Sequence, residues 1–190
     1  MQHHGVPSFT ENTGAVIQPL AVLKGLGVGA HARIADFGAG HGHFTFAAAQ
    51  LVGKDGLVYA VEIQEPLVLA LHHETKSRAL HNVYPIHADA TVLGGTKIPD
   101  DVIDFVFLMS NHVDAAMQRA MMQEAVRITK LLGNIIVIDW LDGATVPFAP
   151  AITQRVSKED TLKNGLSLGL GVIDEFRPGR YHYGVRFHKR

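Results

Sequence analysis

A glycine-rich segment, Asp36-Phe-Gly-Ala-Gly-His-Gly42, is the most informative local pattern in this sequence. It ends a short apolar run, Arg33–Phe37, that is typical of a buried strand, and it precedes a segment of helical composition over 44–52. Glycines at such a junction allow a tight turn and let a ligand approach the backbone. The start of the helix offers free N–H groups and the positive end of its dipole, which favour a negatively charged group. The segment therefore predicts a ligand-binding loop at the edge of a sheet.

The chain beyond this loop alternates strand-like and helix-like segments. Further strands are expected at Leu57–Glu62, Val83–His87, Ile103–Met109 and 135–139, and helices from Glu65 onward and over 114–131. Alternation of this kind implies parallel pairing through right-handed crossovers. The near-continuous apolar strands fit a sheet that is covered on both faces. We therefore expect an α/β protein with a Rossmann-like, doubly wound sheet.

The C-terminal part of the chain departs from this alternation. A helix is expected over 156–166, and two strand-like runs, 172–176 and 181–188, flank a Pro178-Gly179 turn that indicates an antiparallel hairpin. No linker is visible, so we expect a single domain over 1–190. It would consist of an N-terminal extension with one helix (1–29), a cofactor-binding core (30–140) and a C-terminal helix with a β-hairpin (141–190).

Three acidic residues fall at the carboxyl ends of three successive predicted strands. Asp36 ends the first strand, Glu62 ends the second, and Asp89 follows the third. Ligands of open α/β sheets bind at this edge, where an acid after the second strand can accept hydrogen bonds from both ribose hydroxyls. Asp89 is placed to accept from an adenine amino group. The three acids together favour a nucleoside-binding site over isolated solvated turn residues.

The spacing of the glycines bears on which nucleoside is bound. The dinucleotide fingerprint is G-x-G-x-x-G, whereas this chain has G-x-G-x-G and carries His43 where the fingerprint requires its last glycine. A nicotinamide or flavin site is therefore a poor match. Glycines with a purely structural role in an unrelated loop are the remaining alternative.

The motifs together resemble the class I S-adenosylmethionine-dependent methyltransferases. The similarity covers roughly 30–139 and looks greatest to the small stand-alone enzymes grouped with the ubiquinone and menaquinone-biosynthesis methyltransferases. The stretch 56–62 is also similar to fibrillarin, an RNA 2′-O-methyltransferase. The segments that carry the resemblance are Ile34–Gly42, Val61-Glu62, Ala88–Ala90, Ile103–Leu108, Glu124–Lys130 and Gly133–Val137.

This resemblance implies a seven-stranded sheet whose last strand is antiparallel, and it implies roles for individual residues. S-adenosylmethionine would be the cofactor and S-adenosylhomocysteine the product. The cofactor-binding residues would be Asp36, Gly38, Ala39 and Gly40 for the methionine part, Glu62 for the ribose, Ile63, Asp89 and Ala90 for the adenine, and Met109 and Ser110 beside the sulfonium. Phe9, Thr10 and Asn12 resemble a segment that closes over the cofactor.

The chain departs from the family pattern at two places, of which the second bears on the acceptor. Lys130-Leu-Leu-Gly133 stands where the family often has Lys-Pro-Gly-Gly, a structural turn. The Asn/Asp-Pro-Pro-Tyr box of many DNA-base and glutamine N-methyltransferases is replaced by Met109-Ser-Asn-His112, which counts against those acceptors. A small-molecule acceptor is the first hypothesis. An RNA or protein acceptor and a non-catalytic scaffold that keeps the cofactor fold are the alternatives.

Residues after the fourth and fifth strands are candidates for contact with the acceptor. His112 is the candidate general base, because the pKa of an unperturbed imidazole lies near neutrality. Asn111 and Asp114 beside it are equally suited to cap a helix. The remaining candidates lie near the same predicted edge: His41, His43, Asp139, Trp140, Tyr181 and His182.

Composition narrows the function classes further. The 190 residues carry a formal net charge of -1, which does not favour a dedicated nucleic-acid binder. Cysteine is absent, which excludes disulfides and thiolate chemistry, and the 12 histidines show no metal-ligand spacing, so no metal is expected. Neither a signal peptide nor a membrane span is apparent, so a cytoplasmic protein is expected. Homo-oligomerisation is left open.

Overall fold

A computed structural model of the chain describes residues 17–147 and 149–190, which form a sheet with helices on both faces. The elements, in chain order, are α1 (Pro19–Gly25), β1 (Arg33–Phe37), α2 (His43–Val52), β2 (Leu57–Glu62), α3 (Glu65–Ser77), β3 (Val83–His87), β4 (Ile103–Met109), α4 (Ala115–Ile128), β5 (Thr129–Trp140), η1 (Ile152–Gln154), α5 (Lys158–Ser167), β6 (Gly171–Gly179) and β7 (His182–His188).

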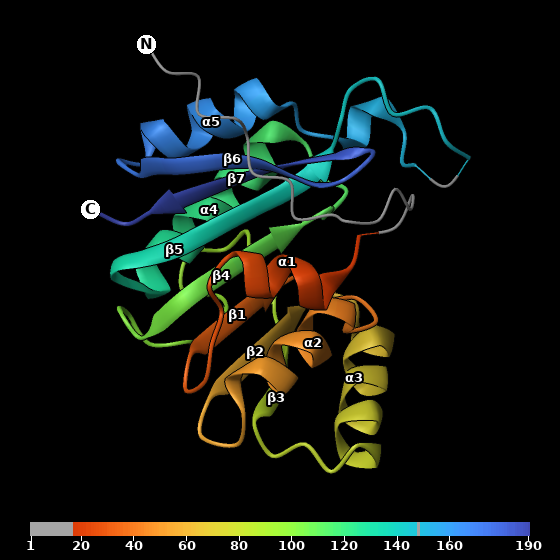
Figure 1. Ribbon diagram of the computed structural model, residues 1–190, viewed down its shortest axis with the longest axis vertical. Helices are drawn as coiled ribbons and strands as arrows, with labels where there is room; N and C mark the ends of the chain where they lie inside the picture. Colours follow the sequence, from red (N-terminus) through yellow and green to blue (C-terminus); the bar gives the residue numbers. More distant parts are fainter. Residues whose placement is uncertain (1–16, 148) are drawn as a thin grey trace.

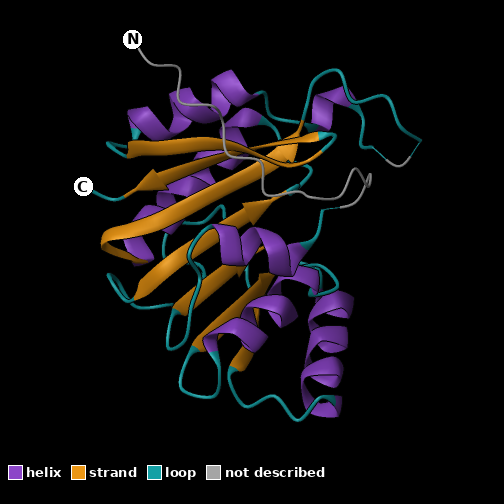
Figure 2. Ribbon diagram, in the orientation of Figure 1, coloured by secondary structure: helices purple, strands orange, loops and turns teal. Residues whose placement is uncertain are grey.

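The seven strands form one twisted sheet in the order β3-β2-β1-β4-β5-β7-β6 (Figures 1 and 2). Strands β1 to β5 pair in parallel, and β7 pairs antiparallel with both β5 and β6. The predicted fold class, a Rossmann-like doubly wound sheet with an antiparallel last strand, is confirmed. The order changes direction between β1 and β4, and their carboxyl ends therefore flank the crevice where such sheets bind ligands.

Alternate residues of each strand face opposite layers of helices. Ile34 and Phe107 pack with Val22 and Ala48 under α1 and α2. Their strand neighbours Ala35 and Val106 pack with α4 in a second core. On the first face, Ala60 meets Leu71 of α3. This burial on both faces explains why the strand sequences are nearly continuous apolar runs.

The predicted boundary between α4 and β5 is wrong. The helix was expected to run to residue 131, but it ends at Ile128 and the strand begins at Thr129. Thr129 turns to an extended conformation with ψ 134° and pairs with Ile103. The backbone N–H of Leu132 then donates to the carbonyl oxygen of Lys189 at 2.9 Å. Pairing with residues remote in sequence thus overrides a helical pattern here.

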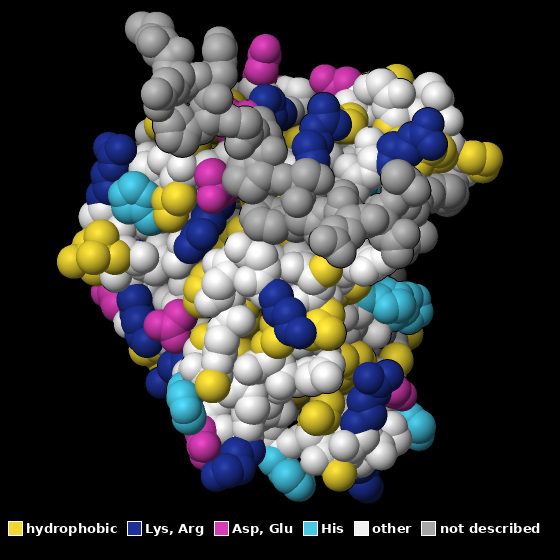
Figure 3. All heavy atoms as spheres, in the orientation of Figure 1, with side chains coloured by type: hydrophobic (Ala, Val, Ile, Leu, Met, Phe, Trp, Pro, Cys, Tyr) yellow, Lys and Arg dark blue, Asp and Glu magenta, His cyan; other side chains and the backbone are white. Residues whose placement is uncertain are grey.

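The helix predicted in the N-terminal extension corresponds to α1, whereas Phe9, Thr10 and Asn12 lie outside the described residues. On the face shown in Figure 3, Lys and Arg side chains are interspersed with Asp and Glu and do not gather in one patch. No helix among residues 17–147 and 149–190 has the length and apolar character required to cross a bilayer.

Candidate functional site

The glycine loop lies between the carboxyl end of β1 and the start of α2. Gly38 and Gly40 have φ values of 70° and 54°, in the left-handed region that glycine adopts without strain. A Cβ at Gly38 would collide with the side-chain amide of Asn111. The backbone N–H groups of Gly38 and Ala39 both donate to the carbonyl oxygen of Val61, at 2.8 and 3.0 Å. The loop is therefore fixed against β2 by the protein's own backbone.

Glu62 holds the same loop from the end of β2. One carboxylate oxygen accepts a hydrogen bond from the N–H of Gly40 at 3.0 Å, and the other accepts from the N–H of Gln64 at 2.9 Å. The residue is 5% exposed. Because a carboxylate has about four acceptor positions, two bonds leave capacity for a ligand's hydroxyl groups.

Asp36 is the second buried acid at this edge. Its carboxylate accepts a hydrogen bond from the hydroxyl of Thr45, on the first turn of α2, at 2.6 Å. Burial raises the pKa of the Asp36 carboxyl to about 6, the charge of Glu62 adds to this, and the bond from Thr45 opposes it. Sequence reasoning missed Thr45, since nothing local marks a helical threonine as the partner of an acid on the preceding strand.

The segment after β4 closes over the glycine loop. Ser110 and His112 have φ values of 46° and 54°, which are uncommon for residues with a Cβ. The side-chain amide of Asn111 donates to the carbonyl oxygen of Phe37 at 2.6 Å, and the N–H of Ser110 donates to that of Ile138 at 2.8 Å. Backbone strain of this kind persists where the surroundings impose it, and it clusters at functional sites. Asp114 caps α4 by accepting from the N–H of Met117 at 2.8 Å.

Two hollows meet at this loop, on either side of Gly38, Gly40, Ser110 and His112. The large hollow has a volume of about 650 Å³ and is lined by Ile17, Pro19, Asp36, Gly38, Ala39, Gly40, His41, His43, Phe44, Met109, Ser110, His112, Trp140 and His182. The small hollow has a volume of about 270 Å³ and is lined by Gly38, Gly40, Val61, Glu62, Ile63, Gln64, Leu67, Ala88, Ala90, Thr91, Ser110, Asn111, His112, Val113, Met117 and Met121.

The structure brings most of the predicted cofactor residues to these two hollows. Asp36, Ala39 and Met109 line the large one, whereas Glu62, Ile63 and Ala90 line the small one. Asp89 differs, since it does not line either of them and its carboxylate accepts from the N–H and the hydroxyl of Thr91 at 2.8 and 2.6 Å. Its predicted role at the adenine stays a prediction. His43 both begins α2 and lines the large hollow.

A pair of rings forms the far wall of the large hollow. Trp140 ends β5 and His182 begins β7, where the two residues are paired across the strands. Their ring centroids lie 4.1 Å apart. The Arg155 guanidinium lies 5.9 Å from the centroid of the Trp140 ring and donates to the carbonyl oxygens of Ala144 and Pro150. The connection after β5 is thereby held beside the rings.

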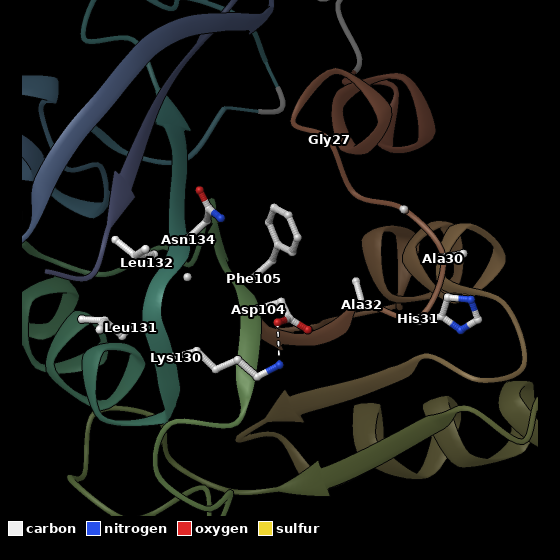
Figure 4. Close-up of a pocket in the computed structure, with 12 residues that line it drawn as sticks. Gly27, Ala30, His31, Ala32, Asp104, Phe105, Lys130, Leu131, Leu132 and Asn134 are labelled. Carbon is white, nitrogen blue, oxygen red and sulfur yellow. Dashed lines mark hydrogen bonds and ion pairs between the residues drawn. The ribbon is translucent and has the colours of Figure 1, made fainter.

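A third hollow, of about 600 Å³, lies at the opposite, amino edge of the sheet. We call it the amino-edge hollow. In Figure 4, Lys130 and Asp104 turn toward each other within it, and their charged groups lie 2.6 Å apart. Asp104 also accepts from the N–H of Arg33 at 2.8 Å. Neither His112 nor any predicted cofactor residue lies there; its lining residues are Gly27, Gly29, Ala30, His31, Ala32, Asp104, Phe105, Lys130, Leu131, Leu132, Gly133 and Asn134.

The part of the chain that carries both carboxyl-edge hollows matches a known family. A family model described as a methyltransferase domain matches residues 34–133, more than half of the chain. The fold and the site thus define a class I S-adenosylmethionine-dependent methyltransferase, as the sequence motifs predicted. The chain belongs to the methyltransferase domain family.

Individual relatives agree with this assignment. The chain is 27% identical over 118 residues to the demethylmenaquinone methyltransferase of Geobacillus stearothermophilus, covering 62% of this chain and 49% of that enzyme. It thus spans about half the length of that relative. A crystal structure of a SAM-dependent methyltransferase from Aquifex aeolicus matches with a TM-score of 0.82 and 23% identity, over 92% of this chain and 90% of that one.

A second solved structure bears on the cofactor. Fibrillarin from Aeropyrum pernix, with natively bound S-adenosyl-L-methionine, matches with a TM-score of 0.67 and 21% identity, over 88% of this chain and 72% of that one. At these identities the two structures establish a shared fold. The cofactor of this family is S-adenosylmethionine.

The charges at the carboxyl edge fit that cofactor. Asp36 and Glu62 are buried beside the hollows, and no Lys or Arg lines either hollow among the described residues. Buried carboxylates need a compensating positive group. S-adenosylmethionine carries a sulfonium and an amino group, both positive. Among residues 17–147 and 149–190, no group of three or more His, Cys, Asp or Glu side chains is arranged to hold a metal ion.

Proposed function

We propose that this protein transfers the methyl group of S-adenosylmethionine to a small, uncharged organic acceptor. The observation that carries the proposal is the pair of buried acids, Asp36 and Glu62, which lie beside the glycine loop where no Lys or Arg of the described residues lines either hollow. The similarity to a demethylmenaquinone methyltransferase supports an acceptor of low molecular weight.

Each end of the loop would hold a different part of the cofactor. Glu62 would accept hydrogen bonds from the ribose hydroxyls in the small hollow, where the apolar side chains of Ile63 and Ala90 leave room for the adenine. Asp36 would face the methionine part in the large hollow, beside Gly38 and Gly40. When bound, S-adenosylmethionine supplies an electrophilic methyl group on a positively charged sulfur.

The residues around the large hollow would orient the acceptor and exclude water. Phe44, Met109 and Trp140 present apolar surface to the hollow. Holding two reactants in line can supply roughly 7–11 kcal/mol of the barrier in favourable cases, so orientation is the main task of these side chains. His112 is exposed and lines both hollows, and it would accept a proton from an acceptor that must lose one.

Titration calorimetry with S-adenosylmethionine, S-adenosylhomocysteine and NAD tests the cofactor. We expect both adenosyl compounds to bind with micromolar affinity and NAD not to bind. Binding of NAD alone, or of none of the three, would overturn the proposal. Transfer of radiolabelled methyl groups to a library of small apolar acceptors then separates an enzyme from a non-catalytic scaffold, which would bind the cofactor without turnover.

An RNA or protein acceptor is not favoured by the charges. Neither carboxyl-edge hollow contains a Lys or Arg among the described residues, and the face in Figure 3 carries no basic patch. Phosphate contacts of a nucleic acid would require such groups. The likeness to fibrillarin establishes the fold and says nothing about RNA binding.

A further inference from the structure

His182 occupies a position that is both buried and close to the reaction space. It is the first residue of β7, 5% exposed, and it lines the large hollow together with Gly38, Gly40 and Met109. The antiparallel pairing of β5 and β7 places it directly opposite Trp140. Two hydrogen-bonded strands therefore set the position of this ring, which does not depend on a flexible loop.

The His182 ring has no hydrogen-bond partner among the described residues. Its Nδ1 atom is buried and unpaired, and it lies 3.9 Å from where a Cβ of Gly179 would be. Burial lowers the pKa of this imidazole to about 4, so the ring is neutral at physiological pH. A neutral imidazole has one donor and one acceptor nitrogen, and burying such groups unpaired costs free energy unless a ligand completes them.

The surroundings of His182 limit what such a ligand can be. Ile17, Pro19, Phe44, Met109 and Trp140 make most of the hollow apolar. No Lys or Arg lines it among the described residues, and the sequence has none among residues 1–23. A carboxylate or phosphate on the acceptor would therefore be desolvated without a counter-ion from these side chains.

We infer that His182 is an acceptor-binding residue, whose ring hydrogen-bonds a hydroxyl or carbonyl oxygen of an uncharged acceptor packed beside Trp140. This inference rests on the proposed function and adds to it the residue that orients the acceptor. The apolar body of the acceptor fills the hollow, and its oxygen completes the unpaired imidazole.

Three probes of matched shape test the inference: naphthalene, α-naphthol and α-naphthoate, each titrated into protein saturated with S-adenosylhomocysteine. In the wild type we expect α-naphthol to bind roughly three- to tenfold more tightly than naphthalene, the size of one net hydrogen bond, and α-naphthoate to bind least. In His182→Phe, which keeps a planar ring, naphthalene affinity should stay within about twofold and the preference for the hydroxyl should disappear.

His188→Phe is the matched control. His188 lies at the other end of β7, and its Nδ1 is also buried and unpaired, but it lines neither carboxyl-edge hollow. The hydroxyl preference should survive there. A preference that persists in His182→Phe, or that is also lost in His188→Phe, would overturn the inference.

A spectroscopic readout keeps the test valid if His182→Phe does not fold. Imidazole ¹⁵N spectra of the wild type should show one histidine with a neutral ring at low pH, and its nitrogen signals should shift with α-naphthol and not with naphthalene. Unshifted signals would overturn the role of His182. Failure of S-adenosylhomocysteine to bind would instead overturn the proposed function, so the two failures are distinguishable.

Discussion

The two edges of the sheet carry hollows of similar size, about 650 Å³ at the carboxyl edge and about 600 Å³ at the amino edge, but their chemistry differs. At the amino edge, Asp104 and Lys130 neutralise each other. At the carboxyl edge, Asp36 and Glu62 are buried without a cation among the described residues, and His182 lacks a hydrogen-bond partner there.

This contrast shows that unmet electrostatic and hydrogen-bonding capacity distinguishes a binding site better than volume does. The amino-edge hollow is satisfied by its own side chains, so it gives a ligand little to complete. At the carboxyl-edge hollows, burial of Asp36, Glu62 and His182 lowers the free energy of unfolding, and a ligand with a positive charge and a hydrogen-bonding group would offset this loss. Variants at matched positions of the two edges test whether this difference is real.

The largest effect is expected from Gly40→Val. A β-branched residue at a φ of 54° is strained, so the loop that we propose to meet the cofactor should be displaced. We expect S-adenosylhomocysteine affinity to fall by more than roughly a hundredfold, measured by calorimetry. Gly29→Val is the control: Gly29 lines the amino-edge hollow, has no positive φ and has open space at its Cβ, so affinity should not change. Equal losses in both variants would contradict the comparison.

Glu62→Ala should weaken binding on the order of a hundredfold, because the two hydrogen bonds that we propose to its charged carboxylate, each worth at least about 1.5 kcal/mol, would be lost. Part of the loss would come from the loop, since Glu62 also accepts from the N–H of Gly40. Asp104→Ala, at the amino edge, should leave the affinity within about twofold. Wild-type affinity in Glu62→Ala, with an unchanged melting temperature, would remove the ribose assignment.

Asp36→Asn should change how stability depends on pH. The pKa of Asp36 is raised by burial from 3.8 to about 6 in the folded protein. The folded state therefore binds the proton more tightly than the unfolded chain, and this group's contribution to stability falls as the pH rises from about 4 to about 6. Asp36→Asn should match the wild type at about pH 4 and exceed its free energy of unfolding by up to about 3 kcal/mol at about pH 8.

Denaturant unfolding of both proteins at the two pH values measures this effect. Affinity for S-adenosylmethionine should fall in the variant, because the negative charge that we propose to face the methionine part is gone. A variant that is less stable than the wild type at about pH 8 would show that the Asp36 carboxylate is compensated within the protein.

The smallest effect is expected from Lys130→Ala at the amino edge. The Lys130 side chain is 43% exposed and its ion pair with Asp104 is screened by solvent. The free energy of unfolding should change by about 1 kcal/mol or less, and cofactor affinity should be unaffected. A loss of affinity in this variant would mean that the amino-edge hollow is coupled to the binding site.

Local patterns in the sequence predicted the strands and the glycine turn between β1 and α2 well. Strands β2, β3 and β4 have the predicted bounds, because each is an apolar run that ends in a turn or a polar residue. The boundary of α4 with β5 failed, because the conformation at Thr129 is decided by pairing with β4 and with the chain after β7. The same limit applies to the site.

Sequence reasoning placed Asp36 and Glu62 at one edge because carboxyl ends of parallel strands share it. It could not show that Thr45 would bind Asp36 or that Asn111 would cover Gly38, since these contacts depend on side-chain placement across the fold. The pairing of His182 with Trp140 depends on β7 entering the sheet beside β5, which no local signal indicates.

The position of β7 has a consequence for the order in which the protein can assemble. It is the last of the seven strands in the chain, yet it lies between β5 and β6. During synthesis, β5 and β6 therefore leave the ribosome with unpaired edges, and the wall of the large hollow stays incomplete until the final strand inserts. Such edges invite pairing with other chains, so the nascent protein should be most prone to association in the interval before β7 is made.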